Sequence, residues 1–434
     1  MSEWMRGSLG ELASGVRGVS YTPNQLQRFI SPETVVLLRS NNIKGGQVNF
    51  DNVQLVPSHI VSNEQLAQHG DIAVCMSNGS KALVGKSGRI EGNEAPCTVG
   101  AFCSIFRPHT HADEKFVSYI FQSGAYRRHL DIILAGSAIN NLRNSDVEAL
   151  SLEIPPRKEQ RLIAHILDTL DTQIQKTEAL IAKLEKVKEG LLHDLLTRGI
   201  DENGRLRPSP EHAPELYKES PLGLIPREWS VSTLGERLSQ YGGFIQTGPF
   251  GSQLHAEEYV REGVPVVMPQ DMRDIEVSKE NIAQITEERA EDLARHRVGE
   301  GDLLFSRRGD LSRCSFMSSS NKGWLCGTGC LLLRPAEHID GFWLANIYKL
   351  SAIQSQVYGM AVGSTMVNLN STILKNIVIP FPAFQEQSKI AEAIKSSKNK
   401  IFEEKNILSK LKLQKIGLMD DLLTGRVRVT PLLD

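Results

Sequence analysis

The sequence predicts an α+β protein in which one unit occurs twice: a mixed α/β domain followed by a long helix, with the two helices pairing as an antiparallel coiled coil. Three observations support this prediction. Short segments recur at a nearly constant separation, each copy holds β-rich runs broken by turns, and each copy ends in a heptad pattern of apolar residues. A chain of 434 residues, 40% of them hydrophobic, is long enough to form more than one buried core.

The duplication is visible in pairs of matching segments that lie 225 or 227 residues apart. Near the N-terminus, EWMRGSLGE (3–11) matches EWSVSTLGE (228–236). At the separation of 227 residues, GAFCSIFRP matches GTGCLLLRP, GSAINNL matches GSTMVNL, Pro155 matches Pro382, Glu159 and Gln160 match Glu386 and Gln387, and LLHDLLT matches LMDDLLT. So many anchors in one order indicate a tandem duplication.

The two copies predict the same domain order. We expect a first domain over 1–155, a helix over 156–198, a polar connector over 199–225, a second domain over 226–382 and a second helix over 383–425. Strands are predicted at TVVLL, DIAVCM and AFCSIF in the first copy and at VPVVM, DLLFS and CLLLR in the second. Helical patterns near 115–134 and 342–358 complete an α+β domain in each copy.

Each copy then ends in a heptad seam of about five repeats. The seam includes Ile163, Leu167, Leu170, Ile174, Ile181 and Leu195 in the first copy, and Ile390, Ile394, Ile401, Leu408 and Leu422 in the second. Pro156 suits an opening turn, while Gly199 and Gly425 lie just past the helix ends, where left-handed caps favour glycine. Two matching seams in one chain favour pairing within the chain, and a homodimeric coiled coil is the alternative.

The composition excludes several classes of protein. No stretch of 18 uninterrupted apolar residues occurs, which argues against a membrane span, and the start lacks the apolar segment of a secretory signal. Six scattered cysteines are not a disulfide framework, so we expect a reducing, cytoplasmic location. A formal net charge of −2 argues against a protein that coats nucleic acid non-specifically, but it allows local basic loops.

Several segments resemble motifs of the specificity subunit of type I restriction-modification systems, and the resemblance covers essentially the whole chain. These segments are PLGLIPREW (221–229), QTGPFGSQL (246–254), GDLLFSRRG (301–309), GSTMVNLN (363–370), IPPRKEQRLIA and FPAFQEQSKIA. One departure is that the first copy has no PLGLIP-type segment before Trp4.

The resemblance implies two target-recognition domains, each of which reads one half of a split double-stranded DNA target. It also implies that the helices set the spacing between the half-sites. The subunit would have no chemistry of its own. It would recruit two copies of an adenine methyltransferase subunit and, for cleavage, ATP-dependent translocating restriction subunits.

Motifs for catalysis, cofactors and metals are weak in this chain. SNGSKALVGKS (77–87) has five residues between its glycines where a P-loop needs four, and no strand followed by GxGxxG or methyltransferase motif is present. Cys103 and Cys330 are repeat-equivalent and lie in apolar runs, so buried hydrophobic positions explain them better than zinc ligands. We therefore predict no catalytic residue, no cofactor and no metal.

Polar and basic loops are the candidate DNA contacts, because arginine suits bidentate contact with guanine and also binds phosphate. In the first domain the candidates are Arg17, Tyr21, Asn41, Asn42, Lys44, Ser77, Asn78, Ser80 and Lys81. In the second domain they are Gln246, Thr247, Ser252, Gln270, Arg273, Ser306, Arg307, Arg308 and Arg313. Since the two sets differ in chemistry, we expect the two half-sites to differ in sequence. For any single residue, a solvated turn position is the alternative.

Two other functions compete with DNA reading. The first is a coiled-coil adaptor whose globular ends bind other proteins, and the second is a stand-alone enzyme. Salt-sensitive binding to DNA would distinguish the DNA reader from the adaptor.

Overall fold

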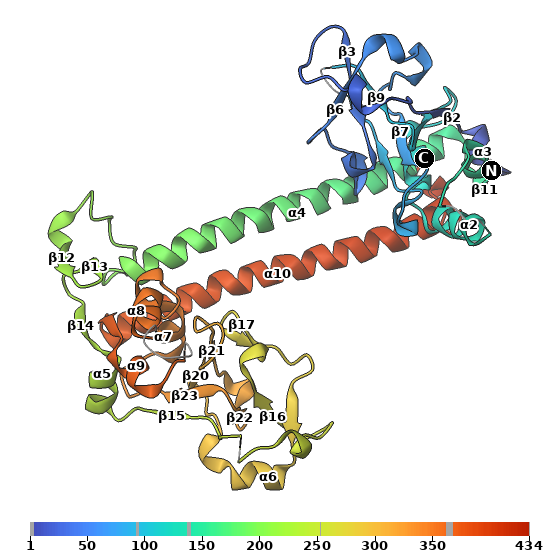
Figure 1. Cartoon of the computed structure of the whole chain (residues 1–434). Helices are drawn as coiled ribbons and strands as arrows, with labels where there is room; N and C mark the ends of the chain where they lie inside the picture. The colour runs from blue at the N-terminus through green and yellow to red at the C-terminus, as the bar shows by residue number, and fades with distance from the viewer. Residues whose placement is uncertain (1–3, 93–94, 137–139, 252, 362–367, 434) are drawn as a thin grey trace. The chain divides into compact units, whose positions relative to one another are not determined.

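The β-rich runs of the sequence pair into the sheets of two domains, and a long helix follows each domain (Figure 1). The structure, a computed structural model, describes residues 4–92, 95–136, 140–251, 253–361 and 368–433. It divides into two units, Met1–Leu180 with Glu404–Asp434, and Ile181–Glu403. Each unit contains one globular domain and part of both long helices, α4 (Arg157–Thr197) and α10 (Phe384–Leu423). Within the described residues, every helix is too short or too polar to cross a membrane.

In the first domain, the opening strand pairs with the strand that leads into α4. This two-stranded sheet is β1 (Met5–Ser8) with β11 (Ser151–Ile154). The largest sheet has the order β2 (Ala13–Arg17), β10 (Cys103–Pro108), β7 (Ile72–Cys75), β8 (Ser87–Arg89), β5 (Gly46–Val48), β4 (Ile43–Lys44), and another sheet has the order β6 (Gln54–Pro57), β3 (Thr34–Leu38), β9 (Cys97–Val99). The helices between β10 and β11 are α1 (Glu114–Ile120), α2 (Gly124–Ala135) and α3 (Asn144–Glu148).

The second domain repeats this plan. Its opening pair is β14 (Ser230–Thr233) with β24 (Val378–Phe381). Its largest sheet has the order β15 (Phe244–Thr247), β23 (Cys330–Arg334), β20 (Leu303–Ser306), β21 (Cys314–Phe316). A three-stranded sheet has the order β19 (Ala283–Ile285), β16 (Val264–Val267), β22 (Leu325–Cys326), and β17 (Met272–Arg273) pairs with β18 (Glu276–Val277). Its helices are α5 (Leu234–Tyr241), α6 (Glu287–Asp292), α7 (Gly341–Ile347), α8 (Ser351–Ala361) and α9 (Ser371–Asn376).

The matching strand orders confirm the tandem duplication. The order β15-β23-β20-β21 reproduces β2-β10-β7-β8, and β19-β16-β22 reproduces β6-β3-β9. One difference is that β4 and β5 join the large sheet through β8, whereas β17 and β18 form a separate hairpin. An ion pair with a buried carboxylate is also repeated: Arg107 contacts the buried Asp71 at 2.8 Å, and Arg334 contacts the buried Asp302 at 2.6 Å.

The two long helices are antiparallel in each unit, as predicted. In the first unit Asp171 and Glu178 of α4 pair with Lys415 and Lys412 of α10 at 2.6 and 2.7 Å. The residue numbers rise along α4 as they fall along α10, which is an antiparallel arrangement. In the second unit the end of α4 and the start of α10 share one core cluster, which includes Leu195, Leu196, Ile390, Ala391 and Ile394.

The helix ends lie where the glycines predict them, whereas three other regions differ from the prediction. The helical pattern near 342–358 forms two helices, α7 and α8. Gly199 and Gly425 adopt φ values of 65° and 73°, the left-handed caps expected there. The helical pattern near 115–134 forms two helices, because the Ser123 hydroxyl accepts a hydrogen bond from the Tyr126 N–H and so starts α2. The predicted connector is also partly folded, since it contains the hairpin β12 (Tyr217–Ser220) and β13 (Gly223–Pro226).

A buried glutamate at the start of α4 ties the first unit together. Glu159 accepts hydrogen bonds from the indole Nε1 of Trp4 at 3.2 Å and from Nη2 of Arg428 at 2.8 Å. Trp4 precedes the first strand, and Arg428 follows the end of α10. Burial by itself raises the pKa of Glu159, but the bonds from Arg428 and Trp4 outweigh it and hold the pKa below its usual value.

The same arrangement recurs at the start of α10. Glu386 accepts hydrogen bonds from Trp229 Nε1 at 3.2 Å and from the guanidinium of Arg207, which follows the end of α4. The Ile200 N–H donates to the same carboxylate at 3.0 Å. We call each set of tryptophan, glutamate and arginine a clasp. Because each arginine comes from the chain after the other helix, each clasp joins a domain to both long helices.

The glutamine beside each clasp glutamate makes matching bonds. Gln160 Oε1 accepts from the Asp113 N–H at 2.9 Å and its Nε2 donates to Pro155 O at 2.9 Å. Gln387 makes the equivalent bonds to the Asp340 N–H and to Pro382 O, both at 3.0 Å. These contacts give a physical reason for the repeated Glu-Gln pair.

Replacing Arg207 by Met should destabilise the chain strongly. The Arg207 and Glu386 side chains are only 8% and 12% exposed, so the variant leaves a largely buried carboxylate without its cation. Loss of one partner from such a pair typically costs about 3–5 kcal/mol. Urea unfolding of the full chain would measure this change.

The matched control is Arg426→Met. The Arg426 side chain is 63% exposed where it pairs with Asp420 and Asp421, and exposed pairs contribute about 1 kcal/mol or less. If the two variants lost equal, small amounts of unfolding free energy, the clasp would not stabilise the fold.

Candidate nucleic-acid interface

In the second domain, a short turn before β17 projects two predicted DNA contacts into solvent. The Asp271 carboxylate accepts a hydrogen bond from the Met268 N–H at 2.8 Å, which closes a single turn over Pro269–Asp271. This turn leaves Gln270 exposed, and Arg273 is exposed at the end of β17. Burial raises the pKa of Asp271 above its usual value, although the Met268 N–H bond opposes this shift.

A second loop meets this turn. Arg313 Nη1 donates to Pro269 O at 3.0 Å, and its Nε donates to Asp310 Oδ2 at 3.3 Å. The two loops line a hollow of about 430 Å³ that contains Gln270, Arg273 and Arg313. Three predicted residues, which lie on two loops in the sequence, therefore converge on one site.

Lys349, which was not among the predicted contacts, also lines this hollow. Its ammonium group and that of Lys398 on α10 both contact Asp274. Burial opposes ionisation of Asp274, but the two lysines outweigh it and lower its pKa to about 2. Lys349 follows α7 outside any loop-like stretch, so no local pattern marks it. The repeat-equivalent residue in the first domain, Gln122, is uncharged.

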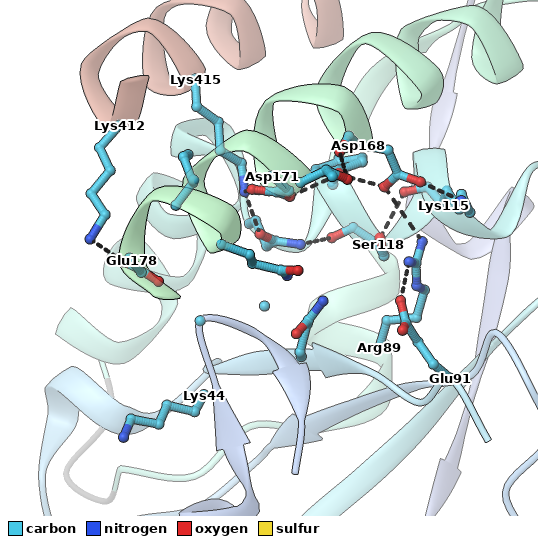
Figure 2. Close-up of a pocket in the computed structure, with 18 residues that line it drawn as sticks. Lys44, Arg89, Glu91, Lys115, Ser118, Asp168, Asp171, Glu178, Lys412 and Lys415 are labelled. Carbon is cyan, nitrogen blue, oxygen red and sulfur yellow. Dashed lines mark hydrogen bonds and ion pairs between the residues drawn. The ribbon is translucent and has the colours of Figure 1, made fainter. Parts of the chain in front are cut away.

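The first domain has a hollow beside the equivalent hairpin, β4 with β5. Lys44 lies in the wall of a cleft of about 660 Å³ bounded by this hairpin, α1, α4 and α10, all within the first unit (Figure 2). The Asn42 amide oxygen accepts from the Arg39 N–H at 3.0 Å, and so closes the turn as Asp271 does. Asn41 and Lys44 are exposed, and they correspond to Gln270 and Arg273.

Most cations of this cleft are paired with carboxylates, as Figure 2 shows. The pairs are Lys115 with Asp168, Lys415 with Asp171, Lys412 with Glu178, and Arg89 with Glu91. Lys44 takes part in none of the ion pairs found among the described residues. Among the described residues that line this cleft, Lys44 is therefore the cation without a carboxylate partner.

Other first-domain candidates lie at strand ends and in one exposed loop. Arg17 Nη1 donates to Leu142 O at 3.4 Å, and the Tyr21 hydroxyl donates to Gln54 Oε1 at 3.0 Å. Ser77 and Asn78 are half-buried after β7, and Ser80 and Lys81 are exposed beyond them, with the Ser80 N–H donating to Asn78 Oδ1 at 3.0 Å.

The remaining second-domain candidates flank the same sheet. Gln246 and Thr247 end β15, and the Gln246 amide donates to Arg295 O. Arg307 is half-buried and Arg308 exposed just after β20. Ser252 lies outside the described residues.

Two predicted residues are buried and hydrogen-bonded within the protein. Asn42 is fully buried, and its Nδ2 also donates to Asp51 O at 2.8 Å. Ser306 is fully buried, and its hydroxyl donates to Arg308 O at 2.8 Å. Both side chains thus make their hydrogen bonds within the protein, and contact of either with DNA stays a prediction.

All six cysteines are buried free thiols. Cys103 and Cys330 occupy matching places in β10 and β23, as expected for apolar positions. Burial raises the pKa of the Cys97 thiol to about 11. The described residues contain no group of three His, Cys, Asp or Glu side chains that could hold a metal ion.

Known proteins resemble this chain in both sequence and fold. The chain is 28% identical over 309 residues to the EcoKI specificity subunit of Escherichia coli K12, covering 70% of this chain and 61% of that protein. It is 25% identical over 378 residues to the putative MjaX specificity subunit of Methanocaldococcus jannaschii, covering 85% and 82%. The match therefore spans about three fifths of the EcoKI subunit's length.

Two solved structures have the same fold over nearly the whole chain. The type I restriction-modification S subunit of M. genitalium gives a TM-score of 0.53 at 17% identity, covering 97% of this chain and 96% of that one. A chain from a structure of a type I restriction-modification system gives 0.56 at 17% identity, covering 98% and 99%. The sequence model of the type I restriction modification DNA specificity domain matches residues 1–186 and again residues 226–413. The chain therefore belongs to the type I restriction-modification DNA specificity family, with two copies of its domain.

Proposed function

We propose that this chain is the DNA-reading subunit of a type I restriction-modification complex in the cytoplasm. The domain over 1–155 reads one half of a split double-stranded target, and the domain over 226–382 reads the other half. The helices set the gap between the half-sites and dock two methyltransferase subunits, and restriction subunits join for cleavage. The chain itself is non-catalytic. The family match and the relatives named as specificity subunits support this proposal.

The observation that carries the DNA-reading role is the convergence of Gln270, Arg273 and Arg313 on one hollow. Arginine can bind guanine through two hydrogen bonds, and glutamine can bind adenine in the same way. The equivalent positions in the first domain carry Asn41 and Lys44 on the same kind of turn. A common backbone with different side chains supports two half-sites of different sequence.

The direct test is methylation. The purified chain with S-adenosylmethionine should methylate no DNA, whereas co-expression with its methyltransferase subunit should give methylation at one split sequence. Methylation by the isolated chain, with contaminants excluded, would contradict the proposal. An adaptor protein would show no salt-sensitive binding to DNA, whereas each phosphate contact of a DNA reader makes its affinity fall as salt rises.

Replacing Arg273 by Ala should weaken DNA binding of the complex by about 1–3 kcal/mol if Arg273 reads a base, and should relax only the second half-site. Arg273 is exposed, and its contact with Glu280 at 3.7 Å joins two exposed side chains, so stability should change little. Binding titrations on targets altered in either half-site would measure the effect.

The control for Arg273 is Arg261→Ala, at an exposed arginine that does not line the hollow. The complex with Arg261→Ala should have the same DNA affinity and the same target choice as the unaltered complex. Wild-type affinity and target choice in the Arg273 variant would remove this residue from the interface.

The spacing role predicts the result of a matched insertion. One heptad added after Ile181 and one after Leu408 keeps the apolar seam in register, since the seam repeats every seven residues. The helices lengthen by ~10 Å at ~1.5 Å per residue, and this equals about three base pairs at ~3.4 Å each. The half-site sequences should stay unchanged while the gap lengthens or affinity collapses. Methylation mapping would detect either result, and full activity at the original gap would contradict the spacing role.

A further inference from the structure

The two domains share one backbone arrangement at the end of a central strand. After β20, the Arg307 N–H donates to Gly329 O and the Leu369 N–H donates to Arg307 O, both at 2.9 Å. After β7, the Met76 N–H donates to Phe102 O and the Leu142 N–H donates to Met76 O, both at 2.8 Å. Three chain segments therefore meet in the same way in each domain.

The next residues extend the match. Arg308 forms an antiparallel bridge with Asn368, and Ser77 forms the same bridge with Asn141. The residue before Gly329 is Thr328, and the residue before Phe102 is Ala101. The first domain therefore places Met76, Ala101 and Asn141 where the second domain places Arg307, Thr328 and Asn368.

The side chains on this common backbone differ in polarity. Met76 is fully buried and apolar, so the first domain has no polar side chain at this position. Arg307 is half-buried, and none of the ion pairs found among the described residues includes it. A half-buried cation without a carboxylate is unfavourable unless another group compensates it.

Three buried polar atoms that find no partner among the described residues lie on these same segments of the second domain. Arg307 Nε, Thr328 Oγ1 and Asn368 Oδ1 are buried atoms that find no hydrogen-bond partner among the described residues. A buried polar atom left without a partner is unfavourable, so each such atom calls for an explanation, and a bound ligand, ion or water is one. Here the three atoms lie on three adjoining segments, directly beside exposed Arg308.

We propose that Arg307, Thr328 and Asn368 form a group that reads the edge of one base pair in the second half-site. This proposal rests on the DNA-reading function proposed above. Arg307 Nε is a donor, Asn368 Oδ1 is an acceptor, and the Thr328 hydroxyl can act as either. A phosphate offers only acceptors and would leave Asn368 Oδ1 unpaired, whereas the edge of a base pair offers donors and acceptors together.

The first domain supplies the variant that tests this group. The double substitution Arg307→Met with Thr328→Ala gives the second domain the residues that the first domain carries on the same backbone. Because the first domain accommodates those residues, we expect the variant complex to fold with an unchanged or raised urea midpoint. Its preference at one position of the second half-site should fall by about 5- to 150-fold, the range for one base contact of about 1–3 kcal/mol. Preference in the first half-site should be unchanged.

Thr328→Val provides a second variant that keeps the side-chain volume and removes only the hydroxyl. It should relax the same single position, so the proposal stays testable even if the double variant folds poorly. Binding titrations over a range of salt concentrations, together with methylation mapping in the complex, provide the readout for both variants.

Two results would overturn the proposal. Unchanged target choice and affinity with a raised urea midpoint would show that the group is only an imperfect part of the core. An equal loss of affinity on every sequence, with the salt slope reduced by about one, would show a phosphate contact instead. Failure of the proposed function itself gives a different result, because the unaltered complex would then methylate no split sequence.

Discussion

The clasp glutamates hold this fold together. Each carboxylate receives an indole N–H from the start of its own domain and a guanidinium from the chain beyond the other helix. In the low-dielectric surroundings of a buried site, these charge-assisted bonds are strong, and removal of one member leaves an uncompensated charge. Gly199 and Gly425 take part as well. A Cβ at Gly199 would lie 2.2 Å from the Glu386 carboxylate, and one at Gly425 would lie 3.0 Å from the Trp4 ring. Glycine is thus favoured at both positions for two reasons: the backbone there is left-handed, and a side chain would crowd the clasp.

The duplicated domains separate the framework from the residues that vary. Two kinds of contact are the same in both copies. One is the ion pair of a buried aspartate with an arginine, Asp71 with Arg107 and Asp302 with Arg334, and the other is the set of glutamine bonds beside each clasp. The turns before β4 and β17 are closed by Asn42 and Asp271 in the same way, yet they present Lys44 in one domain and Arg273 in the other. Such a framework lets exposed side chains change while the elements that position them stay constant.

Prediction from the sequence was strongest for features that occur twice or repeat with a fixed period. The duplication, the antiparallel helices and the glycine caps were predictable because each is written twice or follows a period of seven residues. It was weaker for contacts made by residues that are distant along the chain. Arg207 lay in a segment interpreted as a polar connector, and only the fold brings it to Glu386. Asn42 and Ser306 have the composition of DNA-contacting loops, and their burial depends on packing that no local pattern records. Lys349 joins the candidate site because α7 ends beside it.

The first unit is built from both ends of the chain, and this has a consequence for biosynthesis. Met419, Leu422, Leu423 and Val429 belong to the same core cluster as Leu9, Phe106 and Leu167. A ribosome releases residues 4–180 long before residue 419 has been made, so the nascent first domain must wait with part of its core uncovered. The second unit, residues 181–403, has all its parts available earlier. The unit that is translated first is therefore the one whose core is completed last.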